Sequence, residues 1–283
     1  MIKKKIVLVL LSILFFTQPS QAKEIKIVTS FYPMYIMAKN VTRDIPGISL
    51  ENLTSAYIGC LHDYGLTVRD MKVLSQADIF IANGAGMEAF LDKILIQYPH
   101  LKIVQLSKGI ELINDNPHVW VSISDAIIEV KNLGMALEEF DPDHAKLYQK
   151  NTFEYIEKLE ILRKKMIQEL APYKGRPIVT FHEAFPYFAK EFGFNIVAVV
   201  EREPGSTPSA RELKDTIELI KKSGVNVLFS EPQYPSSAVN VISRETHIKV
   251  YVLDPAVTGP DDYDAYINIM ENNLSVLKKA LEE

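Results

Sequence analysis

Residues 141–171 read DPDHAKLYQKNTFEYIEKLEILRKKMIQELA, with no glycine and no proline after Pro142. Apolar side chains recur in this stretch at helical spacing, at Leu147, Ile156, Leu159, Leu162 and Met166. Asp141 is a suitable N-cap, and Pro142 suits the first helical position. The pattern predicts one helix of about 30 residues and about 45 Å, since each residue adds about 1.5 Å. Such a helix in mid-chain is typical of a stiff connector between two lobes, with an ordinary long helix of one domain as the alternative.

On both sides of this helix, short β-rich runs alternate with helical patterns. The runs before it cover 24–29, 48–53, 78–82 and 102–106, and those after it cover 177–181, 196–200, 225–230 and 249–253. Strands that alternate with helices predict parallel sheets. We therefore expect an α/β fold with two βαβ-type lobes, each with a parallel sheet, joined by the long connecting helix. The expected divisions are a signal peptide over 1–22, an N-terminal lobe over 23–140, a linker helix over 141–172 and a C-terminal lobe over 173–283.

The first 22 residues, MIKKKIVLVLLSILFFTQPSQA, are typical of a cleaved signal peptide. Lysines precede an apolar run over Ile6–Phe16 that is short for a membrane span, and Ser20 and Ala22 are small residues where a signal peptidase reads. No cysteine stands directly after the run to accept a lipid, so we expect no lipobox. We expect an exported, periplasmic protein, with an N-terminal membrane anchor as the alternative.

The composition limits the class of protein. The chain has 283 residues, of which 47% are hydrophobic and 24% are charged, as in globular proteins. A formal charge of −5 argues against a nucleic-acid partner. The single cysteine, Cys60, excludes a disulfide framework, a thiolate zinc site and an iron–sulfur cluster. We expect a monomer.

Four polar residues stand just past predicted strands, where ligands bind in open parallel sheets: His62, His118, His182 and Asp254. Two belong to each half, so they could converge on a cleft between the lobes. Three imidazoles and a carboxylate suit Zn²⁺ in tetrahedral geometry, whereas oxygen donors alone would favour Mg²⁺, Ca²⁺ or Mn²⁺. The spacings form no local motif, so hydrogen-bonded loop histidines are the alternative.

Other residues near these positions are expected to have structural or supporting roles. His100, His144 and His247 are expected to be structural. Cys60 has no CxxC partner, and we expect no catalytic role for it. Glu231 follows a predicted strand, and we expect it to orient an imidazole or to cap the next helix, with a role as metal ligand in competition with Asp254 as the alternative.

Several longer motifs carry a resemblance to a known family. They are HDY at 62–64, NPHVW at 116–120, FHEAFPYF at 181–188, EPGSTPS at 203–209, SEPQ at 230–233 and VLDP at 252–255. In this order the chain resembles the zinc/manganese solute-binding proteins of bacterial ABC transporters, the ZnuA/TroA-like family. The resemblance implies one transition-metal ion between the lobes, held by His62, His118 and His182, with Asp254 as the fourth ligand. It also implies a membrane permease as partner.

The sequence departs from the family pattern in two places. Residues 112–116 are short and hold no histidine, where zinc members often carry a histidine-rich loop, and Gly65 and Leu66 replace the usual Glu-Pro. Manganese members similar to this family often place a glutamate at the position of His182. A histidine there favours zinc without excluding manganese.

We therefore expect a non-enzymatic, periplasmic, high-affinity zinc-binding protein that delivers Zn²⁺ to an ABC-type uptake transporter. A manganese-binding protein of the same class is the main alternative. A zinc-dependent hydrolase would need a water in place of Asp254, and a surface adhesin of the same fold would bind its partner without metal. Because bound imidazoles must be neutral, we expect metal affinity to fall below about pH 6.5.

Overall fold

The computed structural model describes residues 24–55, 58–61, 64–201, 208–233 and 237–282. The described strands form two parallel four-stranded sheets. The first has the order β2-β1-β3-β4 and consists of β1 (Ile25–Thr29), β2 (Ile48–Asn52), β3 (Ile79–Ala82) and β4 (Lys102–Gln105). The second has the order β6-β5-β7-β8 and consists of β5 (Pro177–His182), β6 (Asn195–Glu201), β7 (Val227–Ser230) and β8 (Lys249–Val252). The predicted α/β fold with two parallel-sheet lobes is confirmed.

Helices connect the strands within each lobe. In the first lobe they are α1 (Tyr32–Val41), α2 (Val68–Leu74) and α3 (Leu91–Gln97), and α4 (Ile123–Phe140) follows the last strand, β4. In the second they are α6 (Pro186–Phe192), α7 (Ala210–Ser223) and α8 (Ser237–Thr246), and α9 (Ala265–Glu282) ends the described chain. Every residue of β3 and β7 is buried, as in strands covered on both faces. No helix in the described part of the chain is long and apolar enough to cross a membrane.

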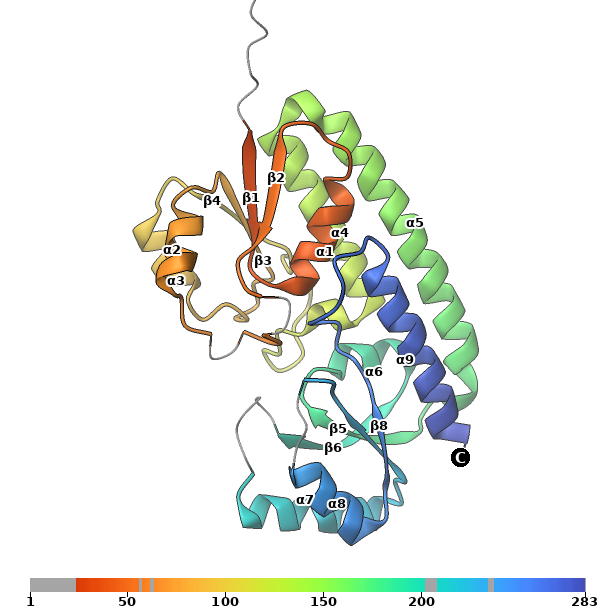
Figure 1. Cartoon of the computed structure of the whole chain (residues 1–283). Coiled ribbons are helices and arrows are strands. Elements are labelled where there is room, and N and C mark those ends of the chain that lie inside the picture. The colour runs from red at the N-terminus through yellow and green to blue at the C-terminus, as the bar shows by residue number, and fades with distance from the viewer. Residues whose placement is uncertain (1–23, 56–57, 62–63, 202–207, 234–236, 283) are drawn as a thin grey trace, which may run out of the picture.

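The long helix α5 (Ala145–Leu170) joins the lobes and has 26 residues, about 39 Å of rise. Figure 1 shows it beside both lobes, with α9 next to it. It packs against α1 and α4 of the first lobe, and against α6 and α9. Its buried side chains are Tyr148, Asn151, Tyr155, Leu159, Leu162, Met166 and Leu170. The connector is therefore supported along its length by tertiary packing.

The start of this helix differs from the prediction. A 3₁₀ turn over Pro142–His144 comes first, so α5 begins at Ala145 and not at Pro142. The Asp141 side chain caps no backbone N–H. Its Oδ2 instead accepts a hydrogen bond from the Tyr148 hydroxyl at 3.0 Å and lies 2.8 Å from His144 Nδ1. Because the Asp141 carboxylate is held by these two side chains, it does not accept a hydrogen bond from the backbone N–H groups at the start of the helix. By contrast, α7 begins with a capping box, in which the side chains of Ser209 and Glu212 each accept from the other's backbone N–H.

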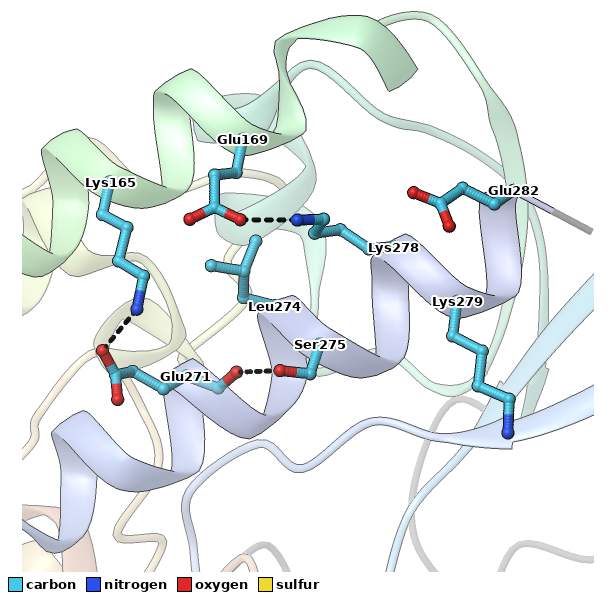
Figure 2. Close-up of a pocket in the computed structure, with 8 residues that line it drawn as sticks. All are labelled: Lys165, Glu169, Glu271, Leu274, Ser275, Lys278, Lys279 and Glu282. Carbon is cyan, nitrogen blue, oxygen red and sulfur yellow. Dashed lines mark hydrogen bonds and ion pairs between the residues drawn. The ribbon is translucent and has the colours of Figure 1, made fainter.

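Two sets of contacts hold helices of different parts of the chain together. The Glu191 carboxylate of α6 accepts hydrogen bonds from the Ile123 backbone N–H and from Arg163 of α5. Between α5 and α9, a groove of about 580 Å³ carries two ion pairs of 2.7 Å, Lys165–Glu271 and Lys278–Glu169 (Figure 2). Since α9 also contacts α1 and β8, it connects the long helix to both lobes.

Two of the carboxyl groups buried in the first lobe differ in their hydrogen bonds. Glu88 accepts hydrogen bonds from the Ser30 hydroxyl and from the backbone N–H groups of Asn83 and Gly84, so it joins the loops after β1 and β3. Glu129 of α4 is fully buried, and neither of its carboxylate oxygens has a hydrogen-bond partner among the described residues. Burial raises the pKa of Glu129 well above its ordinary value, and the nearby acids add to the effect.

Candidate metal centre

His118 lies in the loop after β4, at the start of a 3₁₀ turn over Val119–Val121, and is almost fully buried. The Asn116 side chain fixes it. The Asn116 Nδ2 donates to the Glu183 carbonyl at 2.7 Å. The other side-chain atom, Asn116 Oδ1, is therefore the one that accepts from the His118 backbone N–H, at 2.9 Å. The same Oδ1 lies 3.0 Å from His118 Nδ1. An amide oxygen only accepts, so Nδ1 carries the proton, and in the neutral ring the lone pair is on Nε2.

His182 is the last residue of β5 and is fully buried. Its strand lies between β6 and β7, at the point where the strand order of the sheet reverses, and such points bind ligands in open α/β sheets. Glu231 directly follows β7, and its Oε1 lies 3.3 Å from His182 Nδ1. Glu231 is thus placed to orient the His182 imidazole.

The two histidines meet between the lobes. Their ring centroids are 4.7 Å apart, and the ring planes are nearly perpendicular, at 84°. The Tyr187 hydroxyl of α6 donates to the Asn116 carbonyl at 2.6 Å, which joins the loop of His118 to the second lobe. Residues that the sequence places in different halves therefore share one buried space.

Cys60 lies close to both of these histidines. One ligand atom from each of Cys60, His118 and His182 lies within 4.8 Å of the other two, and all three residues are buried. Sequence reasoning excluded a thiolate from the site because a lone cysteine has no neighbouring partner. The only sequence signal was its place two residues before His62.

The remaining predicted ligands are placed differently. His62 lies outside the described residues. Asp254 follows β8 but is not part of the group of ligand atoms within 4.8 Å. Its Oδ1 accepts a hydrogen bond from the Ala256 N–H at 2.8 Å. The buried Asn273 of α9 holds its backbone through two hydrogen bonds, from Asp254 N–H to Oδ1 at 2.9 Å and from Nδ2 to the Asp254 carbonyl at 2.7 Å.

Burial raises the pKa of three acidic side chains near the histidines: Cys60, Glu231 and Asp254. Burial raises the pKa of the Cys60 thiol well above its usual value, and the charge of Glu231 adds to this. Burial raises the pKa of Glu231, opposed by His182. Burial, with Glu231, raises the pKa of Asp254 to about 6, against a hydrogen bond from Ala256 that lowers it. In the described structure no lysine or arginine pairs with these acids. A cation is the occupant that would stabilise them.

Trp120 connects the loops that carry His118 and Asp254. Its ring is fully buried, with its centroid 5.2 Å from that of His118, and its Nε1 donates to the Pro255 carbonyl at 2.8 Å. The Tyr266 hydroxyl of α9 donates to the Trp120 carbonyl at 2.8 Å. The histidine loop and the aspartate loop are therefore held together by one aromatic residue.

Comparison with known proteins identifies the family. A family profile described as "Zinc-uptake complex component A periplasmic", ZnuA, matches residues 27–280. The chain belongs to the ZnuA family. This is a family of solute-binding transport components and not of enzymes, which removes the hydrolase alternative.

Relatives of this ZnuA-family chain differ in the metal that their names give. The high-affinity zinc uptake system protein ZnuA of Bacillus subtilis is 31% identical over 93% of this chain and 89% of its own. The zinc-binding lipoprotein AdcA of Streptococcus pneumoniae is 30% identical over 99% of this chain, which spans only 62% of AdcA. The solved structure of the solute-binding protein FpvC of Pseudomonas aeruginosa in complex with Mn²⁺ has a TM-score of 0.84 and 29% identity, covering 92% of this chain and 99% of FpvC.

Proposed function

We propose that this chain is the periplasmic zinc-binding protein of an ABC-type metal uptake transporter. It captures Zn²⁺ as cargo between its lobes and delivers the ion to the membrane permease. His62, His118 and His182 are ligands in this proposal, and Asp254 is the fourth. The observation that carries it is the convergence of two buried imidazoles from different lobes, 4.7 Å apart, in a ZnuA-family chain.

Export and organisation belong to the same proposal. Residues 1–22, which lie outside the described residues, act as a cleaved signal peptide. The mature chain is a monomer with lobes over 23–140 and 173–283, joined by the linker helix over 141–172. Membership of a family described as periplasmic supports this location.

The donor set supports zinc over manganese. Imidazole nitrogen is a good donor for zinc, whereas manganese prefers carboxylate and carbonyl oxygen. Asn116 holds the proton of His118 on Nδ1, so Nε2 is the nitrogen that acts as donor to the ion in this proposal. Manganese in FpvC makes Mn²⁺ the competing cargo.

Metal competition tests the proposal. Chelator-treated protein is offered Zn²⁺ and Mn²⁺ together, and the bound metal is measured by elemental analysis. We expect one zinc ion per chain, lost in His118→Ala and in His182→Ala. His100→Ala, at an exposed histidine after α3, is the matched control and should bind zinc normally.

Two results would overturn the proposal. Preferential retention of manganese would mean that manganese, and not zinc, is the cargo. Full zinc binding by both histidine variants would remove the site.

A further inference from the structure

Cys60 is the only cysteine in the chain and is buried in the loop after β2. Its ligand atom and those of His118 and His182 lie within 4.8 Å of one another. Cys60 and His118 come from two loops of the first lobe and His182 from the end of β5 in the second lobe, so the three residues are far apart in the sequence and meet only through the fold. The tertiary structure brings a soft donor and two borderline donors to one point.

The spacing of these atoms suits a single ion. Zinc binds nitrogen at about 2.0–2.1 Å and sulfur at about 2.3 Å, so tetrahedral geometry separates two nitrogens by about 3.3 Å and a sulfur from a nitrogen by about 3.6 Å. With no pair more than 4.8 Å apart, each pair has to approach by no more than about 1.5 Å to share an ion. The required approach is smaller than one metal–ligand bond length.

Glu231 gives a second, independent indication of a cation. Its side chain is fully buried, and neither carboxylate oxygen accepts a hydrogen bond within the described structure. It lies against His182, at 3.3 Å from Nδ1, and close enough to Cys60 for its charge to act on the thiol. A buried carboxylate whose described neighbours are an imidazole at 3.3 Å and a thiol is stabilised when a cation binds among them.

We propose that Cys60 is a further ligand of the transported ion and that its sulfur biases the site toward zinc and softer cations and against manganese. The inference rests on the proposed function. On binding, a sulfur–metal bond replaces the S–H bond, and the proton leaves to the buffer. Thiolate donors favour zinc and Cu⁺ over manganese, which prefers oxygen. The site then discriminates by donor chemistry as well as by geometry.

Cobalt is the probe that tests this inference. Co²⁺ bound to a thiolate gives an intense charge-transfer band in the near ultraviolet, which nitrogen and oxygen ligands do not give. Since the chain has a single cysteine, such a band can come only from Cys60. We expect the band in the Co²⁺-loaded full chain and in His100→Ala, and its loss in Cys60→Ser. The preference for Zn²⁺ over Mn²⁺ should fall by on the order of 10-fold in Cys60→Ser, the scale of losing a supporting metal contact.

The outcomes separate this inference from the proposed function. If Cys60→Ser keeps the band and the selectivity while His118→Ala loses metal, the sulfur ligand is refuted and the zinc site stands. If His118→Ala and Cys60→Ser both bind metal like the unmodified chain, the proposed function fails as well. Should Cys60→Ser not fold, the unmodified chain decides, because a Co²⁺ spectrum without the charge-transfer band overturns the inference.

Discussion

Replacing Asn116 by alanine removes a side chain that acts on both histidines. Its Oδ1 accepts from the His118 backbone N–H at 2.9 Å and lies 3.0 Å from His118 Nδ1, while its Nδ2 donates to the Glu183 carbonyl at 2.7 Å. Glu183 directly follows His182 in the chain. In the variant, Asn116 no longer holds the proton of His118 on Nδ1. The loop of His118 also loses its hydrogen bond to Glu183, the neighbour of His182.

The expected magnitude follows from these contacts. Loss of a hydrogen bond that orients a metal-binding histidine weakens metal binding by about 10–100-fold, or about 1.4–2.7 kcal/mol. Removing the amide also leaves the buried His118 N–H and the Glu183 carbonyl without this partner, which should cost about 1–3 kcal/mol of folding stability. The two effects have separate readouts.

Zinc affinity is measured by competition with a chromophoric chelator, and stability by urea unfolding of the metal-free chain. Asn151→Ala is the matched control. Asn151 is buried to a similar extent, 6% exposed against 7% for Asn116, and donates to the carbonyls of Val41 and Arg43 at 3.1 and 2.7 Å, away from the histidines. It should lose stability and keep its zinc affinity.

The reasoning is refuted if Asn116→Ala binds zinc as tightly as the unmodified chain while losing stability. The Asn116 amide would then hold the loop without affecting the ligand. Equal losses of zinc affinity in both asparagine variants would show that metal binding follows overall stability.

Three further changes test the packing and electrostatics. Asn273→Ala should weaken zinc binding several-fold because it frees the Asp254 backbone, and a chelator competition measures this; unchanged affinity would mean that Asp254 needs no such support. Leu274→Ala, at a buried residue of the α5–α9 groove, should lower the free energy of unfolding by about 2–5 kcal/mol, whereas Lys278→Ala beside it breaks a half-exposed ion pair and should change the urea midpoint little (Figure 2). The raised pKa of Glu129 means that its contribution is fully present below its ordinary pKa and is lost as pH rises through the folded value. Glu129→Gln should therefore reduce the fall in stability of the metal-free chain between pH 5.5 and 7.5, and an unchanged slope in urea unfolding would contradict the assignment.

Local patterns in the sequence are sufficient to predict the secondary structure closely. The β-rich runs, the helical spacing after Pro142 and the Ser209–Glu212 capping box depend on residues near one another in the chain, and the structure has the corresponding elements. Asp141 failed as a predicted N-cap because Tyr148 and His144, both on the following turns, compete for its carboxylate. That competition is settled by side-chain geometry, which no spacing rule contains.

The sequence pattern is sufficient to place His118 in the loop after β4 and His182 at the end of β5, and so to indicate a metal site. Which donors come together in space depends on the packing of the lobes, which sets Cys60 beside both histidines and leaves Asp254 outside that group. The physical reason is that distances between loops of two lobes depend on how α4, α5 and α9 pack and on single contacts such as that from Asn116 to Glu183. Local periodicity determines where a strand ends, and packing between the lobes determines what lies across from it.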